Sequence, residues 1–268
     1  MYADDTHLTY AGDNTGDIES SLNHDLENVK KWLIANKLTL NMAKTEFMLI
    51  GSRQRLYALT SPPIPEINGA PITQVSVAKS LGVLIDNNLN WSSHVDKLTK
   101  KVASGIGALK RVRHLVPQTT LRSIYHALLQ PHFDYCNVVW GNCGITLHDK
   151  LQKLQNRAAR VMTFSNFDEN ACELFTILGW KNLVSQQQIA LATMVYKCLQ
   201  GLAPEYLCSK FANRESVYSL RDSESLMFPF RGQIIIETAS AIEVLLSGIA
   251  YPSKQDKQSL LGISKHDS

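Results

Sequence analysis

The first long apolar pattern in the chain has helical spacing. Leu22, Leu26, Val29 and Leu33 are separated by four, three and four residues, which places all four on one helix face. The pattern begins shortly after Asp17, whose carboxylate can accept hydrogen bonds from free backbone N–H groups. We therefore predict an amphipathic helix that begins at Asp17, with Asp17 as its N-cap.

Short strand-like segments follow this helix. Thr45–Gly51 is a brief apolar run, and Val75–Val77 and Ser80–Ile85 are two more. Between them, Asn68-Gly69 separates two short segments, and both residue types tolerate the positive φ angles of a two-residue hairpin turn. The first third of the chain is thus expected to combine one helix with a small sheet.

The pattern becomes entirely helical after Trp91. Ser92 or Ser93 can begin a helix that runs to about Leu115, where Pro117 ends it and starts the next. The apolar spacing continues in the following segments, and Gly201 ends the last of them. After the helix that begins at Ser92 or Ser93, the predicted helices are Gln118–Leu129, Thr146–Met162, Glu169–Leu178 and Leu183–Gln200. We expect a boundary between the mixed and the helical parts at Asn90–Ser93.

The composition mainly argues against a membrane-spanning or secreted protein. The 268 residues are 44% hydrophobic and 19% charged, as in a globular protein. No uninterrupted run of 18 or more apolar residues indicates a transmembrane helix, and the N-terminal segment does not resemble a signal peptide. We expect a nuclear or cytoplasmic protein without membrane contact.

The five cysteines are scattered and form no C-x-x-C pair, which favours reduced thiols. His132, Cys136 and Cys143 lie near one another in sequence and raise the possibility of a zinc site. A fourth ligand is missing and the neighbours are apolar, so buried structural cysteines are the preferred interpretation. Trp91, Trp140 and Trp180 also have apolar neighbours and are expected in the core.

Positive charge is concentrated in two of the predicted helices. Between Ser92 and Arg122 the chain has several lysines and arginines, among them Lys97 and Lys101, and one acid, Asp96. In the Thr146–Met162 helix, the basic residues recur at spacings of three, four and three, on one face: Lys150, Lys153, Arg157 and Arg160. Such a row can contact successive phosphates of a nucleic-acid backbone, although a solvated helix face is the alternative interpretation.

The N-terminal sequence Tyr2-Ala3-Asp4-Asp5 and several later blocks together resemble a known family. These blocks include WLIANKLTLNMAKTE, KSLGVLID, YHALLQPHFDYCNVVWG and LQKLQNRAAR, in this order. In order and spacing they resemble the C-terminal half of the reverse transcriptase (RNA-directed DNA polymerase) of non-LTR, jockey-like or LINE-like retrotransposons. The resemblance covers roughly residues 1–213.

The resemblance implies roles for particular residues. Asp4 and Asp5 would belong to the polymerase metal site, which holds Mg²⁺ or Mn²⁺, with Asp4 as the more direct ligand. Leu81-Gly82 would form the hairpin that grips the primer end, and Lys44 could assist the departing pyrophosphate. The basic residues of the helical part would contact an RNA template and DNA primer duplex. A simple surface lysine remains the alternative for Lys44.

The expected fold class is α+β: an incomplete polymerase palm, with a small antiparallel sheet plus a helix, followed by an all-helical thumb bundle. We assign residues 1–90 to the C-terminal palm remnant and 91–165 to the helical thumb. Residues 166–213 would be further helices, and 214–268 an atypical, partly disordered tail that does not match the family.

The expected function is that of a truncated polymerase, nucleotidyl transfer on an RNA template. The hairpin strand that should precede Tyr2 is missing, as are the fingers and the first palm aspartate, so we expect a fragment or a misassigned start, inactive alone. A non-catalytic nucleic-acid-binding thumb module and an eroded element without function are the alternatives.

Overall fold

The computed structural model describes residues 6–209, 212–213, 226–227 and 234–236. It divides into two compact units, which we describe separately. The first comprises the described residues up to His94 together with strand β11 (Ile234–Ile236), and the second comprises the described residues from Val95 to Met227. The predicted tail at 214–268 lies outside the described residues except for its two short strands.

The first unit contains the predicted helix, α1 (Thr15–Ala35). Asp17 lies in its first turn and is not the N-cap, so that prediction was wrong: Asn14 caps the helix by accepting the Gly16 N–H at 2.9 Å. Asn14 is preferred because it precedes the first helical turn, where a side-chain oxygen can reach the free N–H groups. The buried side chains of α1 include Leu22 and Leu26, as the spacing predicted.

The strands of this unit form several small sheets. Strand β1 (Tyr10–Gly12), β11 and β3 (Leu49–Ile50) make a three-stranded antiparallel sheet in the order β1-β11-β3. The expectation of a single small antiparallel sheet was too simple, because β2 (Glu46–Phe47) pairs in parallel with β6 (Thr73–Gln74). Leu22 and Leu26 of α1 pack against Phe47, Ile67 and Ile72.

Two hairpins lie in this unit, one at the predicted Asn68-Gly69 turn and one at Leu81-Gly82, which interrupts the strand predicted over Ser80–Ile85. Strands β4 (Glu66–Ile67) and β5 (Ala70–Pro71) flank Asn68 and Gly69, which have φ angles of 58° and 71°. Strands β7 (Val77–Ser80) and β8 (Val83–Asp86) form the second antiparallel hairpin. Two short helical segments, η1 (Met42–Lys44) and α2 (Arg53–Ala58), were not predicted. They are too short to give a periodic apolar pattern.

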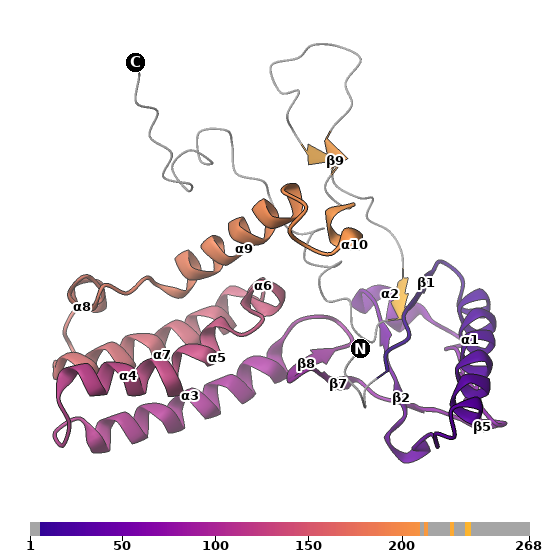
Figure 1. The fold of residues 1–268 in the computed structure, drawn as a ribbon, viewed down its shortest axis with the longest axis horizontal. Helices are drawn as coiled ribbons and strands as arrows, with labels where there is room; N and C mark the ends of the chain where they lie inside the picture. Colours follow the sequence, from indigo (N-terminus) through magenta and orange to yellow (C-terminus); the bar gives the residue numbers. More distant parts are fainter. Residues whose placement is uncertain (1–5, 210–211, 214–225, 228–233, 237–268) are drawn as a thin grey trace, which may run out of the picture. The chain divides into compact units, whose positions relative to one another are not determined.

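The second unit is built mainly from helices, which Figure 1 shows in magenta to orange. The four longer predicted helices agree with α3 (Ser92–Val112), α4 (Gln118–Leu128), α7 (Ile145–Thr163) and α9 (Leu183–Leu199), within about three residues at each end. Helix α8 begins later than expected, because Asn170 caps it. The remaining elements are α8 (Ala171–Leu178), α5 (Gln130–Asp134), α6 (Asn137–Trp140), α10 (Glu205–Cys208) and the paired strands β9 (Ala212–Asn213) and β10 (Leu226–Met227).

The core of the second unit lies where α3, α4 and α7 turn their apolar faces inward. The fully buried side chains include Ile106 and Leu109 of α3, Tyr125 of α4 and Leu151 of α7. Trp180 stacks on the Tyr125 ring with centroids 4.0 Å apart. Trp140 of this unit (4% exposed) and Trp91 of the first unit (1%) are buried, which confirms that these tryptophans pack internally.

Candidate nucleic-acid interface

The predicted basic row of α7 lies opposite the face that this helix buries. At about 100° per residue, Lys150, Lys153, Arg157 and Arg160 fall within about 80° of one another on the helix wheel. The buried residues of α7 lie mostly on the other side: Leu151, Gln155, Ala158, Ala159, Val161 and Met162. The row is therefore a solvent-facing stripe, as the spacing indicated.

Two of the four cations in this stripe have partners within the second unit. Lys150 Nζ lies 2.6 Å from Asp96 Oδ1 of α3, with both side chains about half exposed. The Arg160 guanidinium donates to the Glu169 carbonyl at 3.0 and 3.3 Å and lies over the Phe167 ring, 5.5 Å from its centroid. Both cations are therefore held by internal contacts.

Lys153 and Arg157 differ from these two. Both are exposed, and within the described part of the chain neither side chain has a hydrogen bond or an ion pair. They are one helical turn apart, a rise of about 6 Å. These two side chains are thus the members of the predicted stripe that are available to a ligand.

The basic residues of α3 are distributed around that helix. Lys97 and Lys101 lie about 100° and 140° around the wheel from Asp96, which marks the flank facing α7. Burial lowers the pKa of His132 on α5, and the positive charge of Lys101 lowers it further, which places Lys101 toward α5. The structure therefore does not bring Lys97 and Lys101 together with the stripe of α7.

Helices α3 and α7 run side by side in the same direction. Asp96 near the start of α3 contacts Lys150, and Arg113 just beyond its end lies over the ring of Phe164, which caps the end of α7. On the wheel, the exposed cations within about 60° of Asp96 are Lys100, Lys110 and Arg111. The sequence indicated them only as part of the same basic segment as Lys97 and Lys101, because only the Asp96–Lys150 contact shows which flank of α3 faces α7.

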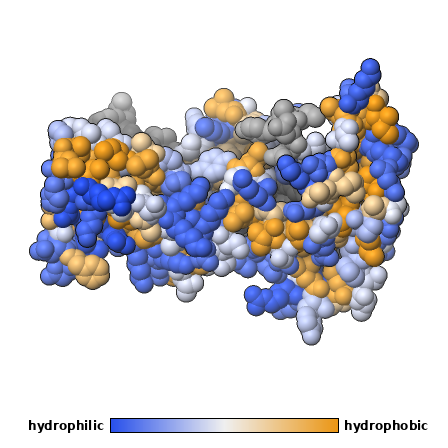
Figure 2. Space-filling model, turned by 90° about the horizontal axis from the view of Figure 1, so that it is seen from below, coloured by the Kyte–Doolittle hydropathy of each residue, from blue (hydrophilic) through white to orange (hydrophobic). Residues whose placement is uncertain are grey.

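The view from below shows that much of the face carrying α3 is hydrophilic (Figure 2). At the left end of this view, hydrophobic and strongly hydrophilic residues adjoin one another. Between Ser92 and Val112, helix α3 contains five lysines or arginines and one acid, and that acid is paired with Lys150. The flank is therefore predominantly positive, which complements a phosphate backbone.

Lys44 and Leu81-Gly82, two of the candidate sites of the first unit, lie on different elements. Lys44 is the exposed last residue of η1, and Leu81-Gly82 forms the turn of the β7–β8 hairpin with φ angles of 45° and 92°. Leu81 is 46% exposed. Asp4 and Asp5 lie outside the described residues. The hairpin predicted at Leu81-Gly82 is confirmed, while its role as a primer grip stays a prediction.

No metal centre is evident among the residues that the structure describes, where no three His, Cys, Asp or Glu side chains gather. Burial raises the pKa of the Cys136 and Cys143 thiols, which disfavours the thiolates that zinc requires. Cys136 and Cys143 thus do not fit a zinc site, and the Mg²⁺ or Mn²⁺ expectation depends on Asp4 and Asp5, which lie outside the described residues.

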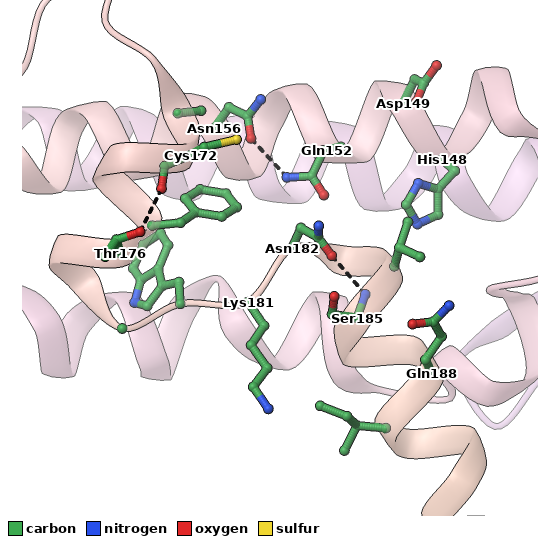
Figure 3. Close-up of a pocket in the computed structure, with 16 residues that line it drawn as sticks. His148, Asp149, Gln152, Asn156, Cys172, Thr176, Lys181, Asn182, Ser185 and Gln188 are labelled. Carbon is green, nitrogen blue, oxygen red and sulfur yellow. Dashed lines mark hydrogen bonds between the residues drawn. The ribbon is translucent and has the colours of Figure 1, made fainter. Parts of the chain in front are cut away.

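A groove of about 740 Å³ lies between α7, α8 and α9 (Figure 3). Its polar wall is a network of amides: Gln152 donates to Asn156 Oδ1 at 2.8 Å and accepts the Leu183 N–H at 2.9 Å. The lining has one lysine, Lys181, and one aspartate, Asp149, while burial lowers the pKa of His148 and favours its neutral form. This nearly neutral groove does not complement phosphate, unlike the flank formed by α3 and α7.

In the described part of the chain, no helix has the length and apolar character needed to cross a membrane.

Comparison with known proteins agrees with the family resemblance in the sequence. The chain is 27% identical over 197 residues to a probable RNA-directed DNA polymerase from transposon X-element of Drosophila melanogaster, covering 72% of this chain and 20% of the relative. It is 28% identical over 166 residues to the corresponding protein from transposon BS of the same species, covering 60% and 18%. A Pol polyprotein from the type-1 retrotransposable element R1 2 of Nasonia vitripennis is 26% identical over 147 residues, covering 52% and 35%.

These curated homologues are RNA-directed DNA polymerases of non-LTR retrotransposons, so the resemblance is confirmed at modest identity over part of the chain. The chain spans about a fifth of the length of the first two relatives. No protein-family model and no solved structure matches it.

Proposed function

We propose that this chain is a segment of a retrotransposon RNA-directed DNA polymerase whose helical unit corresponds to the thumb and binds an RNA template–DNA primer duplex. The similarity to polymerases of transposons X-element and BS supports the family and the reaction, nucleotidyl transfer on an RNA template. The basic flank of α3 and α7 supports contact with the sugar–phosphate backbone of the duplex.

The observation that carries this proposal is the exposure of Lys153 and Arg157 on the outer face of α7. Lysine and arginine side chains that lose no internal contact on binding can neutralise phosphates and release counterions. Lys150 and Arg160 would have to exchange an existing partner for a phosphate. Lys100, Lys110 and Arg111 extend the same positive flank along α3. Lys97 and Lys101 would then contact nucleic acid only from the other side of α3.

In the first unit, Asp4 and Asp5 would contribute carboxylates to the Mg²⁺ or Mn²⁺ site of the polymerase. When bound, that metal would stabilise negative charge on the reacting phosphoryl oxygens. The Leu81-Gly82 turn would contact the primer end, since its positive φ angles present backbone at an exposed hairpin tip. Lys44, also exposed, would supply positive charge for pyrophosphate.

Duplex binding as a function of salt tests the proposal. Binding of a blunt RNA–DNA hybrid is measured by fluorescence anisotropy for the full chain and for the Lys153→Gln/Arg157→Gln double variant. Each phosphate contact contributes about 0.9 to the slope of log K against log[salt], so the variant should flatten the slope by close to two.

A control variant removes the same number of positive charges from another surface of the second unit. Lys181→Gln/Lys197→Gln removes two exposed lysines of the groove and of α9, and should leave the slope unchanged. An unchanged slope for the Lys153/Arg157 variant would contradict a role of α7 in duplex binding.

A further inference from the structure

Two exposed phenylalanines lie just beyond the end of α7. Phe164 caps the helix in a left-handed conformation, with φ of 60°, and is 47% exposed. Phe167 follows three residues later and is 90% exposed. An aromatic ring so open to water gains little from packing, and its exposed face is available to a ligand.

Each of these rings is accompanied by an arginine. The Arg113 guanidinium lies 5.1 Å from the Phe164 centroid, and the Arg160 guanidinium lies 5.5 Å from that of Phe167. His114 meets Phe164 edge to face, with centroids 5.2 Å apart. Arg160 is also fixed by its two bonds to the Glu169 carbonyl, so the ring and the cation are positioned before any ligand arrives.

The charges around this cluster favour an anionic ligand. Lys110 and Arg111 stand exposed near the end of α3, beside Arg113, and Arg157 lies one turn before Arg160 on α7. The same loop also contains Asp168 and Glu169. Hydrogen bonds from Ser165 and from the Asn166 backbone, followed by the charge of Arg160, lower the pKa of Glu169. Glu169 is therefore ionised, and the five cations named above outnumber it and Asp168.

Aromatic faces beside guanidinium groups match a single-stranded nucleic acid, in which unpaired bases stack while phosphates meet cations. Paired bases in a duplex present no free face for such stacking. We infer that Phe164 and Phe167, together with Arg113 and Arg160, form a platform that binds the unpaired nucleotides of a strand leaving the duplex. The inference rests on the proposed function, because the stripe of α7 leads to this platform.

The test compares two hybrids, one blunt and one with about four unpaired RNA nucleotides, near the lower limit of single-strand site sizes. The full chain should bind the overhang hybrid more tightly than the blunt hybrid. Phe167→Ala should remove most of that difference, a loss of about 5- to 150-fold if one base stacks, while the affinity for the blunt hybrid stays the same. Because Phe167 is 90% exposed, this variant should fold normally.

Two further variants make the test specific. Phe167→Trp keeps an aromatic face and should retain the preference for the overhang. Tyr206→Ala removes another exposed aromatic of the same unit, 59% exposed on α10, and should have no effect. Equal affinity of the full chain for both hybrids would overturn the platform, as would an overhang preference that survives Phe167→Ala.

The two proposals fail in different ways. An unchanged salt slope on the blunt hybrid in the Lys153/Arg157 variant contradicts duplex binding by α7 and says nothing against Phe167. Fluorescence of 2-aminopurine placed in the overhang reports stacking separately from affinity. Quenching on binding that is lost in Phe167→Ala supports the platform, and its absence in the full chain overturns it.

Discussion

At the scale of single residues, Asp86 shows how one buried carboxylate shapes the chain between β8 and α3. It is 6% exposed and accepts three backbone N–H groups, from Asn88 (3.1 Å), Asn90 (3.0 Å) and Trp91 (2.8 Å). Within this loop, Leu89 and Trp91 have φ angles of 54° and 66°, a conformation that costs energy for non-glycine residues. The bonds to Asp86 offset that cost.

We predict that Asp86→Ala lowers the free energy of unfolding by about 2–4 kcal/mol, because the buried Trp91 N–H and two partly buried N–H groups lose their acceptor. Urea denaturation followed by circular dichroism measures the change. Asp13→Ala removes an exposed acid from the same unit and should change stability by less than about 0.5 kcal/mol. Equal stability of the two variants would show that Asp86 does not hold the loop.

The sequence predicted the conformation of single residues correctly where neighbouring residues alone decide it. Asn68-Gly69 predicted a hairpin because both residues accept positive φ, and the structure has it there. Asp17 failed as an N-cap because Asn14, three residues earlier, competes for the same role. The role of Asp86 could not be deduced, since its carboxylate acts on a loop whose conformation the sequence does not specify.

At the scale of elements, the longer helices were predictable and their partners were not. The apolar periodicity of α3, α4, α7 and α9 extends over several turns and defines both the helix and its buried face. The contact between Asp96 and Lys150 joins residues 54 positions apart, and the charge pattern of either helix alone does not indicate it.

We predict that Asp96→Asn strengthens duplex binding. The substitution releases Lys150 from its ion pair and removes the one acid of α3, so Lys150 can contact a phosphate. The slope of log K against log[salt] should steepen by about 0.9 in the anisotropy assay.

Asp149→Asn is the control for this prediction, because it makes the same change of charge on α7 beside the groove. Asp149→Asn should increase the affinity for the duplex less than Asp96→Asn does, and it should leave the slope of log K against log[salt] nearly unchanged. If both variants steepen the slope equally, the effect is one of net charge, and Lys150 is not a phosphate contact.

At the scale of the whole molecule, the two units contain different kinds of candidate chemistry. The basic flank belongs to the helical unit, and the described residues of both units lack a cluster of metal ligands. The basic flank itself requires no metal ligand, so its contact with a duplex can be tested without divalent metal.

We predict that removing divalent metal with EDTA leaves the affinity for the blunt hybrid unchanged at constant ionic strength, because Lys153 and Arg157 need no metal. Mn²⁺ titration followed by electron paramagnetic resonance should show weaker binding for Asp4→Asn/Asp5→Asn than for the unsubstituted chain. Asp13→Asn is the control and should bind Mn²⁺ as before. Equal Mn²⁺ binding by all three chains would contradict a metal site at Asp4 and Asp5.

The sequence by itself indicated the longer helices, the Asn68-Gly69 hairpin, the basic stripe of α7 and the resemblance to retrotransposon polymerases. Each follows from residues close together in the chain, through periodicity, turn chemistry or motif order. Only the tertiary structure decided which cations remain free. Packing places Asp96 against Lys150 and Phe167 against Arg160, and leaves Lys153 and Arg157 in solvent. Local spacing places a charge on a helix face, but contacts between distant segments decide whether a ligand can reach it.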